Sequence, residues 1–358
     1  MDFRKKTIRD IDVAGKTVLV RVDYNVPMKD GVIVEDMRIR ASLPTINYLL
    51  EQGSKKVVLV SHLGRPDGEA KAEFSLQPVA ARLAELMPGK EVRFVNECTG
   101  AAVQEAINAL PDGGVLMCEN LRFHPEEEAN DEAFARAIVE STGAEIFVQE
   151  GFAVIHRAHA STDAVARILP AVAGFLVENE VSKLEAAINA PEHPLLVIIG
   201  GAKVEDKQPM IEQFLPIADR IAVGGKIAAD GYVATDEKIY VAEGFNSDEN
   251  GAKLDIDEAS ANKIVEMIRE ARTVVWNGTM GLAEDERFAA GSLAVARAMG
   301  SNTNALTIIG GGDTAGYVEG VLRSEPELKF GLISTGGGAS LELLSGKKLP
   351  GLEVLQDR

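Results

Sequence analysis

The most regular feature of the chain is a series of short apolar segments rich in β-branched residues, separated by stretches with helical periodicity. In the first half these segments are TVLVRVD (17–23), KVVLVSH (56–62), VRFVNE (92–97), VLMCEN (115–120) and IFVQE (146–150). They predict parallel strands buried on both faces, and residues 40–52 and 76–87 predict two of the helices that connect them.

The second half repeats the pattern. Its apolar segments are LLVIIGG (195–201), RIAVGG (220–225), KIYVAE (238–243), TVVWNG (273–278), ALTIIGG (305–311) and FGLIST (330–335). The predicted fold class is therefore α/β, with two doubly wound parallel-sheet (Rossmann-like) lobes. Between them, residues 174–194 predict an amphipathic helix that ends before Pro191 and serves as a hinge. We expect an N-terminal lobe over 1–172, an interdomain helix over 173–190, a C-terminal lobe over 191–340 and a terminal segment over 341–358.

Length and composition agree with two globular lobes. A chain of 358 residues exceeds the roughly 250 to 300 residues at which single cores stop growing. No apolar run reaches the roughly 18 residues of a membrane span, and the N-terminus lacks the apolar core of a signal peptide, so we expect a cytoplasmic protein. Two cysteines, Cys98 and Cys118, do not suggest a disulfide framework. The net charge of −18 argues against nucleic acid as the main partner.

Against this acidic background, cationic and polar side chains gather where the predicted strands of the first half end. They are Arg21, Asp23, Asn25, Arg38, His62, Arg65, Arg122, His156 and Arg157. The planar guanidinium forks of five arginines suit a flat, multi-oxygen anion, and ligands of such sheets bind beyond the carboxyl ends of the strands. The set predicts a pocket for a small phosphorylated acid, whereas any one arginine alone could equally pair with a surface carboxylate.

The HRAH segment (156–159) allows two interpretations. Two imidazoles three residues apart could bind zinc from one helical face, but no third ligand or HExxH pattern lies nearby. We favour anion binding by His156 together with Arg157.

Five glycine-rich turns follow the predicted strands of the second half. They are IIGGAKVEDK (198–207), VGGKIA (223–228), WNGTMG (276–281), IIGGGDTAG (308–316) and STGGGAS (334–340). Glycine lets backbone amides approach phosphate oxygens, and the helix that follows adds its positive N-terminal end. Gly310, Gly312 and Ala315 also fit a variant of the dinucleotide fingerprint, but no acidic residue closes the next strand to bind a ribose. A mononucleotide is therefore the preferred ligand.

Taken together, these motifs resemble the signature segments of phosphoglycerate kinases. The matching segments, in the same order, are RVDYNVP, SHLGRP, ENLRFH, HRAHAST, GGAKVEDK, VVWNG, GGGDT and STGGGASLELL. The resemblance runs from residue 21 to about residue 352. It implies a monomeric kinase that transfers a phosphoryl group reversibly between 1,3-bisphosphoglycerate and Mg-ADP, giving 3-phosphoglycerate and Mg-ATP. It also implies that residues 1–172 bind phosphoglycerate, that 191–340 bind the nucleotide and that 341–358 return to the first lobe.

The resemblance implies a role for each matched residue. Asp23 and Asn25 would bind the hydroxyl and carboxylate end of the substrate, and His62, Arg65, Arg122 and Arg157 would bind the phosphate that is not transferred, with Arg21 and His156 in the same pocket. Arg38, Lys203, Lys207 and the turns at Gly312 and Gly337 would neutralise the phosphoryl group in transit. Asp313 would coordinate Mg²⁺. The nucleotide site would comprise Gly201, Lys203, Lys207, Gly225, Asn277, Gly278, Gly281, Glu284, Gly311, Gly312, Asp313 and Thr314, with Glu284 at the ribose.

The sequence departs from the family pattern in three places. The usual VNDAFG of the hinge is VQEGFA (148–153), and the segment after VGGKIA is short, with Lys226 in place of glycine. WNGTMGLAE (276–284) has Thr279 for proline and Ala283 for a larger apolar residue. These changes leave two alternatives to the ATP-dependent kinase: a relative that binds phosphoglycerate or a nucleotide without turnover, and the same reaction with another nucleoside triphosphate.

Overall fold

The computed structural model describes residues 3–358, and they form two compact units. One unit contains the chain up to Asn179 together with Lys348–Arg358, and the other contains Glu180–Lys347. The division falls inside helix α7 (Phe175–Asn189), which lies within the predicted interdomain helix.

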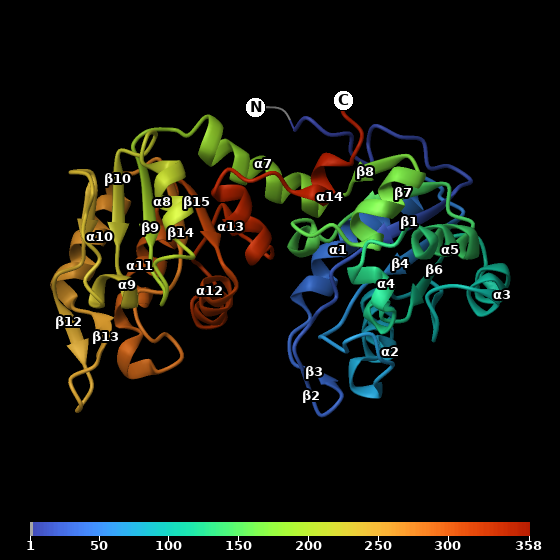
Figure 1. Ribbon diagram of the computed structural model, residues 1–358, viewed down its shortest axis with the longest axis horizontal. Helices are drawn as coiled ribbons and strands as arrows, with labels where there is room; N and C mark the ends of the chain where they lie inside the picture. The colour runs from blue at the N-terminus through green and yellow to red at the C-terminus, as the bar shows by residue number, and fades with distance from the viewer. Residues whose placement is uncertain (1–2) are drawn as a thin grey trace. The chain divides into compact units, whose positions relative to one another are not determined.

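The first unit is built on a six-stranded parallel sheet (Figure 1). Its order is β5-β6-β4-β1-β7-β8, with β1 at Thr17–Arg21, β4 at Lys56–Val60, β5 at Val92–Val95, β6 at Gly114–Cys118, β7 at Ile146–Gln149 and β8 at Ala171–Ala173. The helices that flank or connect the strands are α1 (Met37–Glu51), α2 (Gln77–Leu86), α3 (Ala101–Ala109), α4 (Pro125–Glu128), α5 (Glu132–Thr142) and α6 (Val165–Ile168). A small hairpin joins β2 (Met28–Lys29) to β3 (Val32–Ile33).

The central strands of this sheet have the character of a core. Every residue of β1, β4 and β6 is buried, because helices cover a parallel sheet on its faces. Val18 and Val20 of β1 pack in one cluster with Val57 and Leu59 of β4. The continuous apolar runs that predicted these strands are therefore a consequence of double-sided burial.

The C-terminal residues pack on the first unit. The backbone N–H of Gln356 donates to the carbonyl of Ala171 at 3.0 Å, and Asp357 forms an antiparallel bridge with Lys5. Helix α14 (Pro350–Glu353) contributes Gly351, whose N–H donates to the carbonyl of Ile155 at 2.8 Å. These bonds attach Lys348–Arg358 to the strand edge and to the loop after β7.

The second unit has its own six-stranded parallel sheet, in the order β11-β10-β9-β14-β15-β16 (Figure 1). The strands are β9 (Leu195–Ile199), β10 (Arg220–Val223), β11 (Ile239–Val241), β14 (Thr273–Asn277), β15 (Leu306–Gly310) and β16 (Leu332–Ile333). Its helices are α8 (Gln208–Phe214), α9 (Gly225–Ala229), α10 (Glu258–Glu270), α11 (Ala290–Ser301), α12 (Gly312–Ser324) and α13 (Gly338–Leu344). An antiparallel pair, β12 (Phe245–Ser247) and β13 (Lys253–Ile256), was not predicted.

The predicted fold class is confirmed, and the strand orders locate the binding crevices. Counted along the chain, the second sheet has the order 3-2-1-4-5-6, which is the dinucleotide-fold order and reverses between β9 and β14. The first sheet reverses between β1 and β7. Ligands bind beyond the strand ends at such reversals, so we expect the binding sites to follow these four strands. None of the described helices is long and apolar enough to cross a membrane.

Candidate functional site

The polar residues predicted for the first unit follow four strands of one sheet. Arg21 ends β1, His62 comes two residues after β4, and Arg122 follows β6 in a short 3-10 helix (Leu121–Phe123). His156 and Arg157 follow β7. The carboxyl ends of parallel strands meet at one edge of a sheet, so these side chains gather there although the first and the last are more than one hundred residues apart in sequence.

Arg21 belongs to a buried polar network. Its side chain is 1% exposed, and its Nε donates to Ser161 Oγ at 2.8 Å. Its Nη2 lies 3.1 Å from His62 Nδ1, and its Nη1 donates to the carbonyl of Val22. Burial lowers the pKa of Arg21, while the charges of Glu127 and Asp23 act in the opposite direction. The guanidinium is therefore held in one orientation by partners on all sides.

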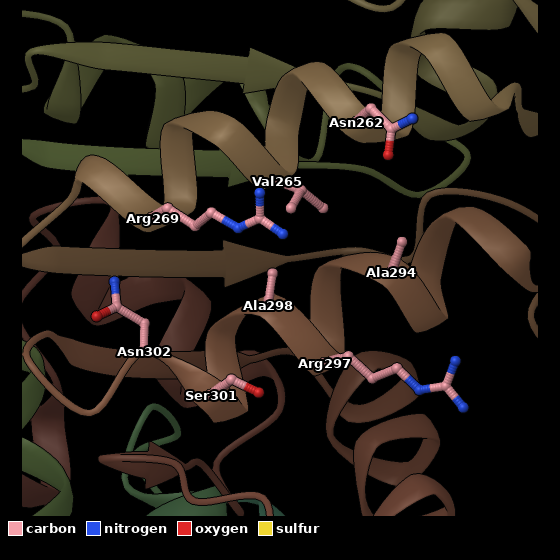
Figure 2. Close-up of a pocket in the computed structure, with 8 residues that line it drawn as sticks. All are labelled: Asn262, Val265, Arg269, Ala294, Arg297, Ala298, Ser301 and Asn302. Carbon is pink, nitrogen blue, oxygen red and sulfur yellow. The ribbon is translucent and has the colours of Figure 1, made fainter.

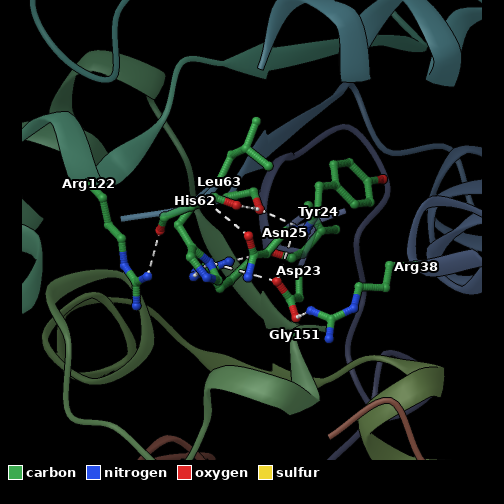
Figure 3. A network of polar contacts seen from close by, with 12 residues as sticks. Asp23, Tyr24, Asn25, Arg38, His62, Leu63, Arg122 and Gly151 are labelled. Atoms are coloured by element: carbon green, nitrogen blue, oxygen red, sulfur yellow. Dashed lines mark hydrogen bonds and ion pairs between the residues drawn. The ribbon is translucent and has the colours of Figure 1, made fainter. Parts of the chain in front are cut away.

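Asp23 and Asn25 form the next part of the same cluster. Asp23 accepts a hydrogen bond from Arg38 Nη1 of α1, and its other oxygen lies 3.7 Å from His62 Nδ1 (Figure 3). Asn25 Oδ1 accepts the backbone N–H of Gly64 at 2.9 Å, which leaves the Asn25 amide group as a donor. A carboxylate between two cationic or polar groups and a free amide donor can together position a small hydroxy acid.

The remaining arginines differ in how tightly they are held. Arg122 is 6% exposed, donates to the carbonyl of Gly64 at 2.9 Å and pairs with Glu128 at 3.1 Å. Arg157 Nε lies 3.2 Å from His156 Nε2. Arg65 is exposed, and it makes no hydrogen bond or ion pair within residues 3–358. Arg65 is thus the guanidinium of this set that is available to an incoming anion without loss of a protein partner.

Histidines in this cluster are held neutral. Burial is the first cause that lowers the pKa of His62 well below its usual value, and Arg21, Arg122 and Arg38 lower it further. Burial, followed by Arg122 and Arg21, lowers the pKa of His159 to about 4. A histidine surrounded by arginines favours its neutral form, because the neighbouring positive charges repel the protonated ring. These rings therefore act as neutral hydrogen-bonding groups near pH 7.

The depressed pKa of His159 predicts how stability changes with pH. The unfolded chain takes up the proton near the ordinary value of 6.5, whereas the folded protein takes it up near 4. The unfolded state therefore binds more protons in this window, and the free energy of unfolding falls as pH falls from 6.5 towards 4. Urea unfolding at several pH values should show a smaller decline for His159→Gln than for the wild type. Other buried groups contribute equally to the pH dependence of both proteins. Parallel curves of unfolding free energy against pH would therefore contradict the prediction.

In the second unit, glycines bring the chain segments after β9 and β14 into close contact. Gly200 donates its N–H to Asn277 O at 2.9 Å, and Gly201 donates to Thr279 O at 2.9 Å. Gly278 has a φ of +94°, and a Cβ at this position would lie 2.1 Å from Gly200 O. The two turns can meet only because neither has a side chain there. They meet at the point where the strand order reverses.

Lys207 and Asn277 form the polar part of this switch point. Lys207 precedes α8, and its Nζ donates to Asn277 Oδ1. Burial lowers the pKa of Lys207, and the charges of Asp206 and Asp313 oppose the shift. Asn277 is fully buried, and its Nδ2 has no hydrogen-bond partner. A buried amide donor without a partner is costly, so this group is suited to bind an acceptor that the protein does not supply.

Other predicted nucleotide-site residues surround these two. Thr314 Oγ1 accepts the N–H of Gly278 at 2.8 Å, which ties the first turn of α12 to the end of β14. Gly225 begins α9 with a φ of +62° and lies against Gly201 and Thr279. Gly281 forms an antiparallel bridge with Asp255. The structure thus brings the turns after β9, β10, β14 and β15 together, as expected for parallel strands.

Five predicted positions, three side chains and two turns, face open space. Lys203, Glu284 and Asp313 are exposed and make no hydrogen bond or ion pair with the described residues. Gly312 and Gly337 each begin or precede a helix, α12 and α13, and a Cβ at either position would meet nothing within 4 Å. Backbone amides at helix starts can bind phosphate oxygens.

Asp313 satisfies the chemical requirement for a magnesium ligand. Mg²⁺ prefers oxygen and is commonly bound through one or two carboxylates plus substrate phosphates. Asp313 offers a carboxylate without a protein partner in the first turn of α12, near the charge of Lys207. No group of three or more His, Cys, Asp or Glu side chains that could hold a metal occurs among residues 3–358. The donor set fits a metal shared with a nucleotide, not an ion bound by protein alone.

A separate hollow lies on helices α10 and α11 of the second unit (Figure 2). It is lined by Asn262, Val265, Arg269, Ala294, Arg297, Ala298, Ser301 and Asn302, none of which was predicted as a site residue. Arg297 is already engaged by Glu325 at 2.6 Å. The hollow therefore does not extend the site at the strand ends.

Sequence reasoning missed Glu127 and Ser161. Glu127 is 0% exposed and accepts from both the backbone N–H and the hydroxyl of Ser161, which in turn contacts Arg21. Ser161 lies in a π-helical turn (Ala160–Ala164), a feature that is rare and often found at functional sites. The available signal was position: Glu127 lies three residues after the matched segment ENLRFH, and Ser161 lies within the matched segment HRAHAST.

Comparison with protein families gives a match over most of the chain. The model described as phosphoglycerate kinase matches residues 8–242 and 229–347. The two matched segments overlap at 229–242, which is where the sequence predicts a shortened connection between β10 and β11. In the structure, α9 and residues 230–238 alone join these parallel strands.

Individual relatives are similar along their whole length. A phosphoglycerate kinase of Pelotomaculum thermopropionicum is 42% identical over 399 aligned residues, covering 99% of this chain and 100% of the relative. One from Roseiflexus is 44% identical over 399 residues, covering 99% of each. Among solved structures, the phosphoglycerate kinase of Pyrococcus horikoshii has a TM-score of 0.84 at 30% identity, and that of Coxiella burnetii has 0.80 at 32%, each covering 98% of both chains.

Proposed function

The chain belongs to the phosphoglycerate kinase family, and we propose that it transfers a phosphoryl group reversibly between 1,3-bisphosphoglycerate and Mg-ADP, as a cytoplasmic monomer. The observation that carries the proposal is the pairing, in one chain, of a buried cationic cluster on one sheet with a glycine-lined switch point and Lys207 on the other.

In the proposed assignment, the unit that contains β1 binds phosphoglycerate. Asp23 and Asn25 bind its hydroxyl and carboxylate end, while Arg21, His62, Arg65, Arg122, His156 and Arg157 bind the phosphate that is not transferred. The support is chemical: buried Arg21 and Arg122 and exposed Arg65 supply planar donors, and neutral His62 supplies a further donor without adding charge. Fixed donors of this kind orient a phosphate more precisely than mobile surface lysines do.

We assign the nucleotide to the unit that contains β9. Gly201, Gly225, Asn277, Gly278 and Gly281 shape the site, Glu284 binds the ribose, and the amides of Gly311, Gly312 and Thr314 bind phosphate oxygens. Asp313 holds Mg²⁺, which neutralises charge on the nucleotide phosphates when it is bound. The unpartnered Nδ2 of Asn277 and the partner-free carboxylate of Asp313 support this assignment.

The proposed chemistry requires alignment and charge stabilisation, and it requires no nucleophile from the protein. A carboxylate oxygen of 3-phosphoglycerate attacks the γ-phosphorus of the nucleotide, and the bond from that phosphorus to the bridging oxygen of ADP breaks. Arg38, Lys203 and Lys207 neutralise the equatorial oxygens, aided by amides at Gly312 and Gly337. Lys207 is suited to this role because its partly buried ammonium group is oriented by Asn277 Oδ1.

A coupled assay of 3-phosphoglycerate phosphorylation by Mg-ATP tests the function directly. We expect turnover that an excess of EDTA abolishes and that added Mg²⁺ restores. Clear calorimetric binding of 3-phosphoglycerate without detectable turnover would instead identify a non-catalytic relative. Replacing ATP by GTP in the same assay tests the third possibility, because an equal or higher kcat/KM with GTP would show that the short β10 to β11 connection has changed the base preference.

A further inference from the structure

The helix α4 places three consecutive glutamates in three different environments. Glu126 is exposed, and its carboxylate makes no hydrogen bond or ion pair with the described residues. Glu128 is half exposed and pairs with Arg122 Nε at 3.1 Å. Glu127 is 0% exposed. A buried carboxylate is costly unless it is hydrogen-bonded and close to a positive charge, so we expect Glu127 to have both kinds of partner.

Both oxygens of Glu127 bind the same residue. Oε2 accepts the backbone N–H of Ser161 at 2.9 Å, and Oε1 accepts the Ser161 hydroxyl at 2.6 Å. A serine hydroxyl has one proton, and here that proton points to Glu127. The Ser161 oxygen is therefore left as an acceptor, and it accepts Arg21 Nε–H at 2.8 Å. Because Arg21 can only donate in this bond, the contribution of Glu127 is to hold the Ser161 hydroxyl with its lone pair facing Arg21.

Arg21 in turn selects the tautomer of His62. Its Nη2 lies 3.1 Å from His62 Nδ1, and a guanidinium can only donate, so Nδ1 must accept. A neutral ring with an unprotonated Nδ1 carries its proton on Nε2. His62 Nε2 makes no hydrogen bond within residues 3–358, so its N–H remains available to a ligand.

The opposite tautomer has a ready partner in the same cluster. Asp23 Oδ1 lies 3.7 Å from His62 Nδ1 and, after a small movement, could accept a hydrogen bond from a protonated Nδ1. In that state Nε2 would carry a lone pair, which repels the oxygens of a phosphate. Which tautomer prevails depends on whether Arg21 is held against Nδ1.

We propose that Glu127 is a positioning residue for the phosphoglycerate site: through Ser161 it fixes Arg21, and through Arg21 it keeps His62 as an Nε2–H donor to the phosphate of the substrate. The inference rests on the proposed function of this site. The attraction between the charges of Glu127 and Arg21, and the depression of the His62 pKa by burial and by Arg21, are consistent with this chain of contacts.

The test compares Glu127→Gln with Glu126→Gln, which removes the same charge from an exposed neighbour in the same short helix. A glutamine at 127 has one acceptor oxygen and an NH₂ donor, so it cannot accept from both the N–H and the hydroxyl of Ser161. We expect the KM for 3-phosphoglycerate to rise about 10- to 100-fold, as for loss of a hydrogen bond to a charged group, with little change in the KM for Mg-ATP. Glu126→Gln should match the wild type.

A second readout separates positioning from a general loss of structure. Long-range ¹H–¹⁵N spectra of the ligand-free enzyme should show His62 protonated on Nε2 in the wild type, and a shift towards the Nδ1–H tautomer in Glu127→Gln. Ser161→Ala keeps the charge of Glu127 but removes the hydroxyl link, and it should produce the same shift. If Glu127→Gln does not fold, Ser161→Ala tests the link alone.

The possible failures are distinguishable. A folded Glu127→Gln or Ser161→Ala protein with the wild-type tautomer and an unchanged KM for 3-phosphoglycerate overturns the positioning role. A wild-type protein that does not bind 3-phosphoglycerate overturns the proposed function of the site, whatever the tautomer of His62. A rise in KM without a change of tautomer also overturns the inference, because Glu127 would then act by another route.

Discussion

Replacing Lys207 with alanine is expected to lower kcat by about 10²- to 10³-fold, the range found when one donor to developing transition-state charge is removed. The Lys207 ammonium group is partly buried and is oriented by Asn277 Oδ1. In such an environment a fixed charge stabilises the transferring phosphoryl oxygens more strongly than it would in water. The measurement is kcat in the coupled assay with both substrates saturating.

Two comparisons make the Lys207 result specific. Lys329→Ala removes a lysine from an exposed position of the same unit, and it should leave kcat unchanged. Calorimetry should give the same affinity of Lys207→Ala and the wild type for 3-phosphoglycerate, because that ligand is assigned to the other unit. A loss of kcat of less than threefold would exclude Lys207 from the transfer step.

The apolar pattern of the sequence predicted the architecture because burial on both faces gives the central strands continuous apolar sequences. Val18, Leu19 and Val20 are all fully buried, so the β1 segment reads as a continuous run. The order of the strands cannot be predicted in the same way. The strands β1 and β9 are both central and have similar apolar sequences, but they lie in sheets of different strand order. The strand β8 and the pair β12 and β13 were missed because AVA, FNS and KLDI contain no continuous run of large apolar residues, whereas β11 and β16, which are as short or shorter, lie in such runs.

The site was predictable to the extent that its chemistry is local. Arg21, His62 and Arg122 stand directly beside strand ends, so their approximate place follows from the fold class. The partners of these groups are set by tertiary packing. Three adjacent glutamates look alike in sequence, and only burial shows that Glu127 faces Ser161 whereas Glu126 faces solvent. Residues that orient a binding group are therefore harder to predict than the binding group itself.

Gly278 lies at a position where the backbone conformation and the close approach of a neighbouring turn both exclude a side chain. Its φ of +94° is unfavourable for a residue with a side chain, and its Cβ would lie 2.1 Å from Gly200 O and 2.8 Å from Gly201 N. The turn cannot easily move away, because Gly278 donates to Thr314 Oγ1 and accepts from Trp276 Nε1 at 2.7 Å. An alanine here must therefore separate the turns after β9 and β14.

Gly278→Ala is accordingly expected to lower the free energy of unfolding by about 2 to 5 kcal/mol, combining backbone strain of about 1 to 2 kcal/mol with overpacking of about 1 to 3 kcal/mol. It should also weaken nucleotide binding, because Lys207 and Asn277 lie beside the displaced turn. Urea unfolding and calorimetric titration with Mg-ADP measure the two effects.

The matched control for Gly278→Ala is Gly320→Ala. Gly320 lies inside α12, where an added Cβ meets nothing within 4 Å, so alanine should raise stability by about 0.5 to 1 kcal/mol through helix propensity. The same chemical change should therefore have opposite signs at two positions of one unit. Equal effects at both positions, or wild-type nucleotide affinity in Gly278→Ala, would show that the contact between the β9 and β14 turns does not form the nucleotide site.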